Sequence, residues 1–260
     1  MLLLALSSLL MPAVQQPSAV PALAPPPVEA MQDPPADPWS GSLAAGLTWI
    51  TGNSESSTGT LDFAAKYDKQ KYFCTAFANY SGVRQEDSAT GDSTTTSRLY
   101  TAGASHNRYF SAARTWYAYA NGAWRMDEPH GLQVRDSAGV GVGHSWKWDE
   151  DKSSFNAEAG PSYVIENLVA LPSDSFASAR VAEALDWAIG TDWKIINHGE
   201  LLQSVDDTDD RSATADAGVR WTFASTWFAQ ATVAVAWDNT PAPGFEKTDW
   251  RYTVSLGSSF

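Results

Sequence analysis

The feature that most constrains this chain is a two-residue alternation of apolar and polar side chains that recurs from residue 39 to residue 260. In WRYTVSLGSSF, residues 250–260, aromatic and aliphatic side chains take nearly every second position, and Arg, Thr, Ser and Gly take the others. A period of two is that of a β-strand. The alternation predicts about twelve strands, at 42–49, 61–67, 72–85, 95–107, 113–126, 132–148, 155–166, 176–187, 189–202, 211–223, 227–238 and 246–260.

The connections between these segments indicate how the strands are arranged. Connections after odd-numbered segments are mostly long and acidic, such as QEDSATGDST and QSVDDTDDR, and those after even-numbered segments are mostly short, such as DKQK and ASTW. GNSE and WDEDKSS are exceptions. Long loops at one end and short turns at the other are typical of outer-membrane barrels, which also have an even number of strands. We therefore predict an all-β, transmembrane, antiparallel up-and-down β-barrel of about 12 strands over residues 39–260.

Most of the tryptophans lie at or near the ends of the predicted strands. An indole ring prefers a membrane–water interface, where the ring is half buried and its N–H stays hydrated. A soluble core would instead place tryptophan in the middle of strands. The predicted interface aromatics are Trp49, Trp124, Trp146, Trp148, Trp187, Trp221, Trp227, Trp237 and Trp250.

The face opposite the aromatic side chains carries ionisable residues of both signs. A sandwich core could not hold them without a large desolvation cost, whereas a barrel lumen can. Glu183 falls on the apolar face, and a β-bulge would explain its position. The predicted lumen-lining residues are Asp62, Lys66, Arg125, Glu158, Lys194, Asp216, Arg220 and Arg251.

The first 38 residues differ from the rest of the chain. The apolar run MLLLALSSLLMPAV has the length of a signal peptide, and an A-x-A site at 22–24 sets the predicted signal peptide at residues 1–24. The run lacks a positive n-region, so a membrane-anchoring helix is the alternative. Residues 25–38 are rich in proline and predict an extended linker. We therefore expect export through the periplasm.

The opening hairpin, residues 39–68, resembles the salt-induced outer-membrane protein family. The resemblance lies in Trp39, Gly41, Gly46 and the turn Thr51-Gly52-Asn53 followed by a Ser/Thr run, and it extends to Phe260 through the strand rhythm. It implies a bacterial barrel domain in the cell outer membrane, in contact with the lipid bilayer and lipopolysaccharide. It also implies that the barrel-assembly machinery reads the terminal strand, so Phe260 is the predicted assembly signal. The resemblance brings no catalytic residues.

The residues give little sign of chemistry. A net charge of -13 argues against nucleic acid, and one cysteine excludes a disulfide framework. GVGVGH, residues 139–144, lacks the spacing of a dinucleotide motif, and its glycines instead form one lumen-facing stripe. His144 and Ser145 point to opposite faces, and the four histidines lack metal-ligand spacing. The aspartates of the acidic loop 206–210 are expected to be solvated. We predict no catalytic residue, no metal and no cofactor.

The expected function is therefore that of a non-enzymatic outer-membrane barrel, acting in envelope integrity or in passive passage of small solutes. A barrel of this size has little room inside, so its lumen-facing side chains could fill it. Two alternatives stay open. One is an outer-membrane barrel enzyme of lipase or protease type, and the other is a secreted soluble β-sandwich that acts as a binding module. The sequence assigns neither a solute nor an oligomeric state.

Overall fold

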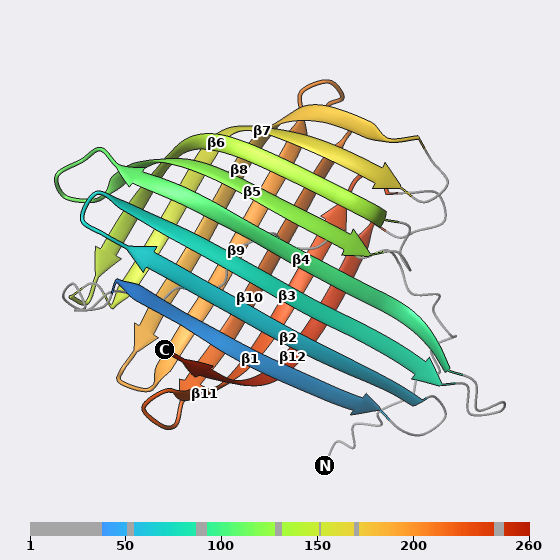
Figure 1. Cartoon of the computed structure of the whole chain (residues 1–260), viewed down its shortest axis with the longest axis horizontal. Helices are drawn as coiled ribbons and strands as arrows, with labels where there is room; N and C mark the ends of the chain where they lie inside the picture. Colours follow the sequence, from blue (N-terminus) through green and yellow to red (C-terminus); the bar gives the residue numbers. More distant parts are fainter. Residues whose placement is uncertain are drawn as a thin grey trace, which may run out of the picture.

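Twelve antiparallel strands close into one barrel, in which each strand pairs with the next and β12 returns to β1 (Figure 1). The computed structural model describes residues 38–50, 55–86, 93–127, 132–150, 152–168, 172–241 and 247–260. The predicted all-β, up-and-down barrel of 12 strands is confirmed. The strands are β1 (Trp39–Ile50), β2 (Glu55–Asp68), β3 (Tyr72–Glu86), β4 (Ser93–Tyr109), β5 (Trp116–Asp127), β6 (Leu132–Trp148), β7 (Ser153–Leu168), β8 (Asp174–Ile189), β9 (Trp193–Ser204), β10 (Arg211–Thr222), β11 (Trp227–Asp238) and β12 (Thr248–Ser259).

Two predictions about the start of the chain lie outside the described residues. These are the signal peptide, 1–24, and the linker, 25–38, of which the structure describes only Pro38. Among the described residues, no helix is both long enough and apolar enough to cross a bilayer.

The connections at the two ends of the barrel differ less in length than the sequence suggested. The connections at 69–71, 110–115, 149–152, 190–192 and 223–226 mark one end, here called the short-turn end. The opposite end, here called the loop end, has connections that are shorter than predicted, because the strands continue beyond their apolar parts. β3 and β4 stay paired as far as Glu86 and Ser93, since a backbone ladder does not require apolar side chains. Trp39 and Phe260 both lie at the short-turn end.

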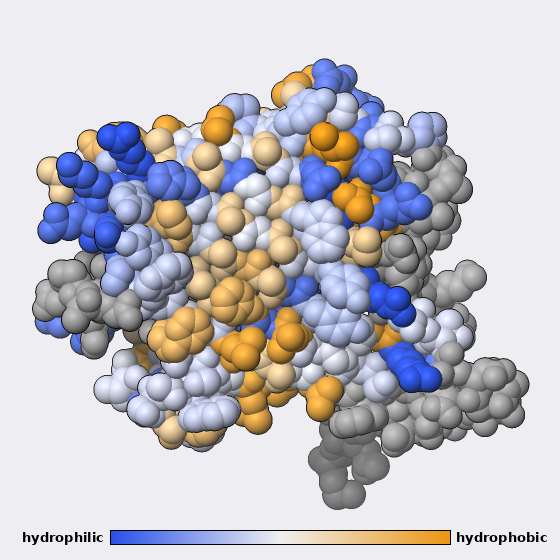
Figure 2. All heavy atoms as spheres, in the orientation of Figure 1, coloured by the Kyte–Doolittle hydropathy of each residue, from blue (hydrophilic) through white to orange (hydrophobic). Residues whose placement is uncertain are grey.

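The closed sheet has its apolar side chains on the outside. Along β12 the large side chains of Trp250, Tyr252 and Val254 are exposed, whereas Ser255 and Gly257 are buried. Figure 2 shows hydrophobic residues gathered across the middle of the face formed by β1 to β4, with many hydrophilic residues toward the two ends. We call this exposed apolar surface the outer belt; it includes Leu43, Leu47, Leu61, Phe63, Tyr80, Tyr100, Val140, Val142, Tyr163, Ile165, Val181, Leu201, Val219, Val233, Tyr252, Val254 and Leu256.

The glycines of β6 form an inward-facing stripe, as the sequence predicted. Gly141 and Gly143 lie directly opposite Tyr119 and Tyr117 of β5. A Cβ atom on Gly141 would lie 2.7 Å from the hydroxyl of Tyr119, and one on Gly143 would overlap the ring of Tyr117. The two tyrosine rings therefore lie flat against β6, in space that any other residue would fill.

The barrel closes through Gly41 and Phe260. The amide of Gly41 donates to the carbonyl of Phe260 at 2.9 Å, and the amide of Phe260 donates back to the carbonyl of Gly41 at 3.0 Å. The ring of Phe260 covers Gly41 so closely that a Cβ atom there would overlap it. Beyond this pair, Ser42–Gly46 of β1 pairs with Ser255–Ser259 of β12.

We expect that removing Phe260 destabilises the barrel more than Phe260→Ala does. Truncation after Ser259 deletes both backbone hydrogen bonds to Gly41, whereas the alanine variant keeps them and loses only the ring. At about 0.5–1.5 kcal/mol for each bond, the truncated chain should be less stable than the alanine variant by about 1–3 kcal/mol. Denaturant unfolding of the refolded proteins measures the difference. Equal stabilities for the two variants would show that the ring, and not the backbone pair, closes the barrel.

Candidate functional site

The inner face of the barrel holds the chemically distinctive residues of the chain. All eight predicted lumen-lining residues sit at strand positions that point inward, and the described side chains there are buried or half-buried. That they line a passage for a solute stays a prediction. These residues are Asp62, Lys66, Arg125, Glu158, Lys194, Asp216, Arg220 and Arg251.

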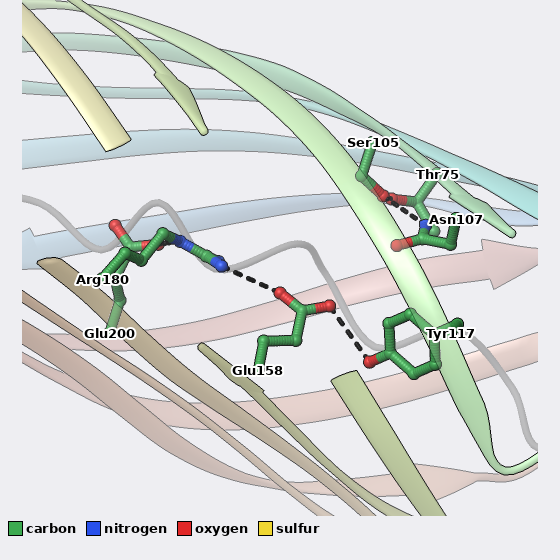
Figure 3. Close-up of polar contacts among 7 residues, drawn as sticks. All are labelled: Thr75, Ser105, Asn107, Tyr117, Glu158, Arg180 and Glu200. Carbon is green, nitrogen blue, oxygen red and sulfur yellow. Dashed lines mark hydrogen bonds and ion pairs between the residues drawn. The ribbon is translucent and has the colours of Figure 1, made fainter. Parts of the chain in front are cut away.

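Four side chains from four strands form what we call the interior network: Tyr117, Glu158, Arg180 and Glu200. Arg180 donates from Nη1 to Glu158 Oε2 at 2.9 Å and from Nε to Glu200 Oε2 at 2.6 Å. The other carboxylate oxygen of Glu158 accepts from the hydroxyl of Tyr117 at 3.0 Å. Figure 3 shows Glu158 lying between Arg180 and Tyr117. Removing one partner from such a buried pair typically costs about 3–5 kcal/mol, because it leaves an uncompensated charge.

The glycine stripe of β6 makes the interior network possible. Gly143 pairs with Tyr117 of β5 on one side and with Glu158 of β7 on the other. Since Gly143 has no side chain, Tyr117 can lie across β6 and reach a carboxylate two strands away. The sequence prediction included Glu158 but missed its three partners. Alternation along the strands could have identified two of them. Arg180 lies on the same face of β8 as Asp186, and Glu200 lies on the same face of β9 as Lys194.

A hydroxyl cluster lies on the neighbouring strands β3 and β4 (Figure 3). The hydroxyls of Thr75 and Ser105 are 2.7 Å apart, and the side-chain amide of Asn107 donates to Ser105 Oγ at 2.7 Å. A serine nucleophile needs a general base, and neither partner of Ser105 is one. The cluster can orient a polar solute or water, but it does not have the geometry of a catalytic pair.

His144 and Ser145 are also separated by the barrel wall. Ser145 is buried on the inner face, whereas the ring of His144 lies outside, 4.5 Å from the ring of Trp116 and 4.2 Å from that of Trp146. The nearest sequence candidate for a Ser–His pair therefore cannot act as one.

Acids and bases are paired elsewhere on the inner face. Besides the interior network, the paired groups and their distances are Arg135–Glu166 at 2.9 Å, His198–Asp216 at 3.0 Å, Lys66–Asp68 at 3.0 Å, Lys194–Asp186 at 3.8 Å, and the hydrogen bonds of Arg220 to Gln230 at 2.9 Å and of Asn79 to Asp62 at 2.7 Å. Burial of so many charges is tolerable only because each has a partner of opposite sign or a hydrogen bond.

Several inner side chains are almost completely buried. Only 1% of Arg125, 2% of Tyr117, 2% of His198 and 5% of Arg180 is exposed. Side chains lining an open, water-filled channel would have a large fraction of their surface accessible. Little of the surface of these four side chains is therefore accessible to water.

The predicted interface aromatics lie mostly on the outer face. Trp124, Trp146, Trp187, Trp221, Trp227 and Trp250 are exposed, Trp148 and Trp237 are half-buried, and the side chain of Trp49 lies outside the described residues. The prediction missed Trp116 and Trp193, which are also exposed; the ring of Trp193 stacks on that of Trp221 with centroids 5.9 Å apart. That these rings lie at a membrane interface stays a prediction.

Glu183 points outward from the middle of β8 without a bulge. Its strand pairs in continuous register with β7 and β9, so the suggested bulge is wrong. The residue opposite it on β9 is Gly199, and Oε1 of Glu183 lies 2.8 Å from where a Cβ atom of that glycine would be. The absence of a side chain at Gly199 leaves the carboxylate space to lie along the wall.

The acidic loop between β9 and β10 is held by hydrogen bonds within the loop and to the connection after β11. Asp207 Oδ1 accepts from the amide of Asp209 at 2.9 Å, and Asp210 Oδ1 accepts from the hydroxyl of Thr240 at 3.2 Å. Burial raises the pKa of Asp210, and the hydrogen bond from Thr240 opposes this rise. In the part of the chain that the structure describes, no group of three or more His, Cys, Asp or Glu residues is placed to hold a metal ion.

Several solved structures are similar to this one at low sequence identity. The translocator domain of the autotransporter NalP from Neisseria meningitidis is 10% identical, covers 85% of this chain and 87% of its own, and has a TM-score of 0.46. A bacterial polysaccharide outer-membrane secretin is 11% identical, with 85% and 97% covered and a TM-score of 0.42. The P. putida toluene transporter TodX is 8% identical, with 85% and 87% covered and a TM-score of 0.32.

No curated protein matches the chain. Residues 43–260, which include almost the whole barrel, match the family described as "Protein of unknown function, DUF481". The match begins within β1 and runs through β12 to Phe260, so it takes in the interior network, the glycine stripe and β12, but not Gly41. This chain therefore belongs to the DUF481 family.

Proposed function

We propose that this protein is a non-enzymatic β-barrel of the bacterial outer membrane that serves envelope integrity. One observation carries the proposal: apolar side chains face outward around a closed sheet whose inner face holds paired charges. In water this arrangement would be unfavourable on both faces, since the outer belt would be hydrated and the charges desolvated. In a bilayer the outer belt is solvated by lipid, and closure of the sheet satisfies the backbone.

The expected orientation places the short turns in the periplasm and the loop end outside the cell. Trp39 and Phe260 would then both lie on the periplasmic side, where an exported chain meets the barrel-assembly machinery. The exposed tryptophans would lie at the two interfaces, and lipopolysaccharide would surround the half of the barrel nearer the loop end. The resemblance of the opening hairpin to the salt-induced family agrees with a role in the envelope.

Passive passage of small solutes is the second candidate function. The polar character of the inner face favours it, since the hydroxyl cluster and the interior network could both form hydrogen bonds with a solute. The low exposure of Arg125, Tyr117 and Arg180 counts against it, because little of these inward side chains is accessible to a solute. Envelope integrity therefore has the better support, with passage requiring some side chains to move.

The protein should fractionate with outer membranes on a sucrose gradient and should need detergent once extracted. Unboiled protein should migrate faster on a denaturing gel than boiled protein, because a closed barrel resists detergent. Recovery as a soluble monomer without detergent would contradict the proposal and favour the soluble binding module.

Ala231→Lys should destabilise the barrel by about 2–4 kcal/mol in lipid, because Ala231 is exposed on the outer face near the middle of β11, where a charge would meet hydrocarbon. Lys194→Leu is the comparison on the inner face, where it removes the partner of Asp186. It should leave insertion intact. Denaturant unfolding in lipid vesicles measures both. A neutral Ala231→Lys together with a strongly stabilising Lys194→Leu would mean that the inner and outer faces are reversed.

Arg180→Ala should raise the conductance of the refolded barrel in planar bilayers. It removes the side chain that links Glu158 to Glu200 and leaves two acids that repel each other. The control is Lys152→Ala, which removes the same charge from an exposed turn and should leave the low conductance of the wild type unchanged. Heat-modifiable migration verifies that each variant is folded. A large wild-type conductance that Arg180→Ala does not alter would show that the interior network does not restrict passage.

A further inference from the structure

The seam between β1 and β12 is paired along only part of its length. Pairing begins at the short-turn end and stops at Gly46–Ser255, although β1 continues to Ile50 and β12 extends back to Thr248. Over the rest of the seam, β1 remains paired with β2 and β12 with β11. Among the described strands, this seam has the shortest pairing in the barrel, and the unpaired part lies toward the loop end.

The register identifies the backbone groups that lose their partners. Gly41 and Phe260 exchange two hydrogen bonds, and in an antiparallel ladder every second pair repeats this arrangement. The next such pairs are Leu43–Ser258 and Ala45–Leu256, which lie within the paired part. Continuing the series leads to positions 47 and 254 and then to 49 and 252, which lie beyond it. The backbone groups of Trp49 and Tyr252 therefore face each other across the seam without a ladder.

The unpaired stretch of the seam consists of residues 47–50 of β1 and 248–254 of β12. The side chains beside it differ between the outer and the inner face. On the outside, 71% of Tyr252, 67% of Leu47 and 64% of Val254 is exposed, and the first two are the highest values for any large apolar side chain in the described residues. On the inside, the neighbouring position of β12 is Arg251, whose positive charge acts on the carboxylate of Asp62 on β2. The stretch is therefore flanked by large apolar side chains outside and by one base, Arg251, inside.

We propose that this stretch is a lateral opening that joins the barrel interior to the outer leaflet and accepts a single-chain amphiphile with an anionic head group. This proposal rests on the outer-membrane location proposed above. Unpaired backbone groups facing hydrocarbon cost several kcal/mol each, so a seam that is open at this depth needs a polar partner. An amphiphile supplies one: its head group enters toward Arg251, and its chain lies outside against Leu47, Tyr252 and Val254.

The attraction between Arg251 and Asp62 acts as the closing element. Asp62 is held in place by the side-chain amide of Asn79, which donates to its Oδ1 at 2.7 Å. An anionic head group competes with Asp62 for the guanidinium, and its binding weakens their attraction across β1. A neutral amphiphile of the same chain length does not compete with Asp62 for the guanidinium of Arg251.

Amide hydrogen exchange in lipid nanodiscs tests the opening on the wild-type protein. The amides of Trp49 and Tyr252 should exchange about tenfold or more faster than those of Ala45 and Leu256, which lie on the same two strands within the paired part. Equal protection of the two sets would overturn the opening. Flotation with lipid vesicles keeps the two proposals distinct: a protein that does not float contradicts the outer-membrane location, and one that floats with uniform protection contradicts only the opening.

The ligand class is tested with dodecanoate against dodecanol. Dodecanoate should change the exchange rates of Trp49 and Tyr252, dodecanol should not, and Arg251→Gln should abolish the response to dodecanoate. Lys194→Gln is the matched control, because it removes an inward base on β9 and should leave the response intact. A response to both probes, or one that survives Arg251→Gln, would show that the charge does not select the ligand.

Discussion

The structure depends on one constraint, which is that a sheet of twelve strands satisfies its backbone by closing on itself. Closure requires β12 to find β1, and the hydrogen bonds between Gly41 and Phe260 begin that pairing. Once the ring is closed, each strand has only an inner and an outer face. Side chains along a regular strand then alternate between two environments, so a charged residue in the outward series, such as Glu183, stays outside even though it is ionisable.

The inner face shows how a barrel can be filled with charge and still be stable. Arg180 is placed between Glu158 and Glu200, and other inward bases, such as Arg135 and His198, also have acids within reach. Pairing lowers the cost of burial, and it also ties neighbouring strands together through their side chains. The same contacts that stabilise the wall therefore also occupy part of the interior.

Sequence alone was sufficient for the strands, because a period of two can be read from a single strand, and the sorting of the connections then indicated the barrel. It placed Glu158 and Lys194 on the inner face for the same reason. It could not find the interior network, since the contact of Tyr117 with Glu158 depends on the register of three strands and on Gly143 between them. It also overstated the connections at the loop end, because polar residues such as those near Glu86 continue a strand as readily as they form a loop.

The glycine stripe has a consequence for assembly. Tyr117, Tyr119 and Asn121 of β5 lie opposite Gly143, Gly141 and Gly139 of β6, so three bulky side chains match three empty positions. A slip of the two strands by two residues in one direction would set Tyr117 against Ser145, and in the other direction would set Asn121 against Ser137. Either slip sets a β5 side chain against a serine, whose own side chain occupies the space that a glycine leaves empty. The stripe therefore specifies the register of β5 and β6. Without it, a glycine-rich strand would have a weakly specified register.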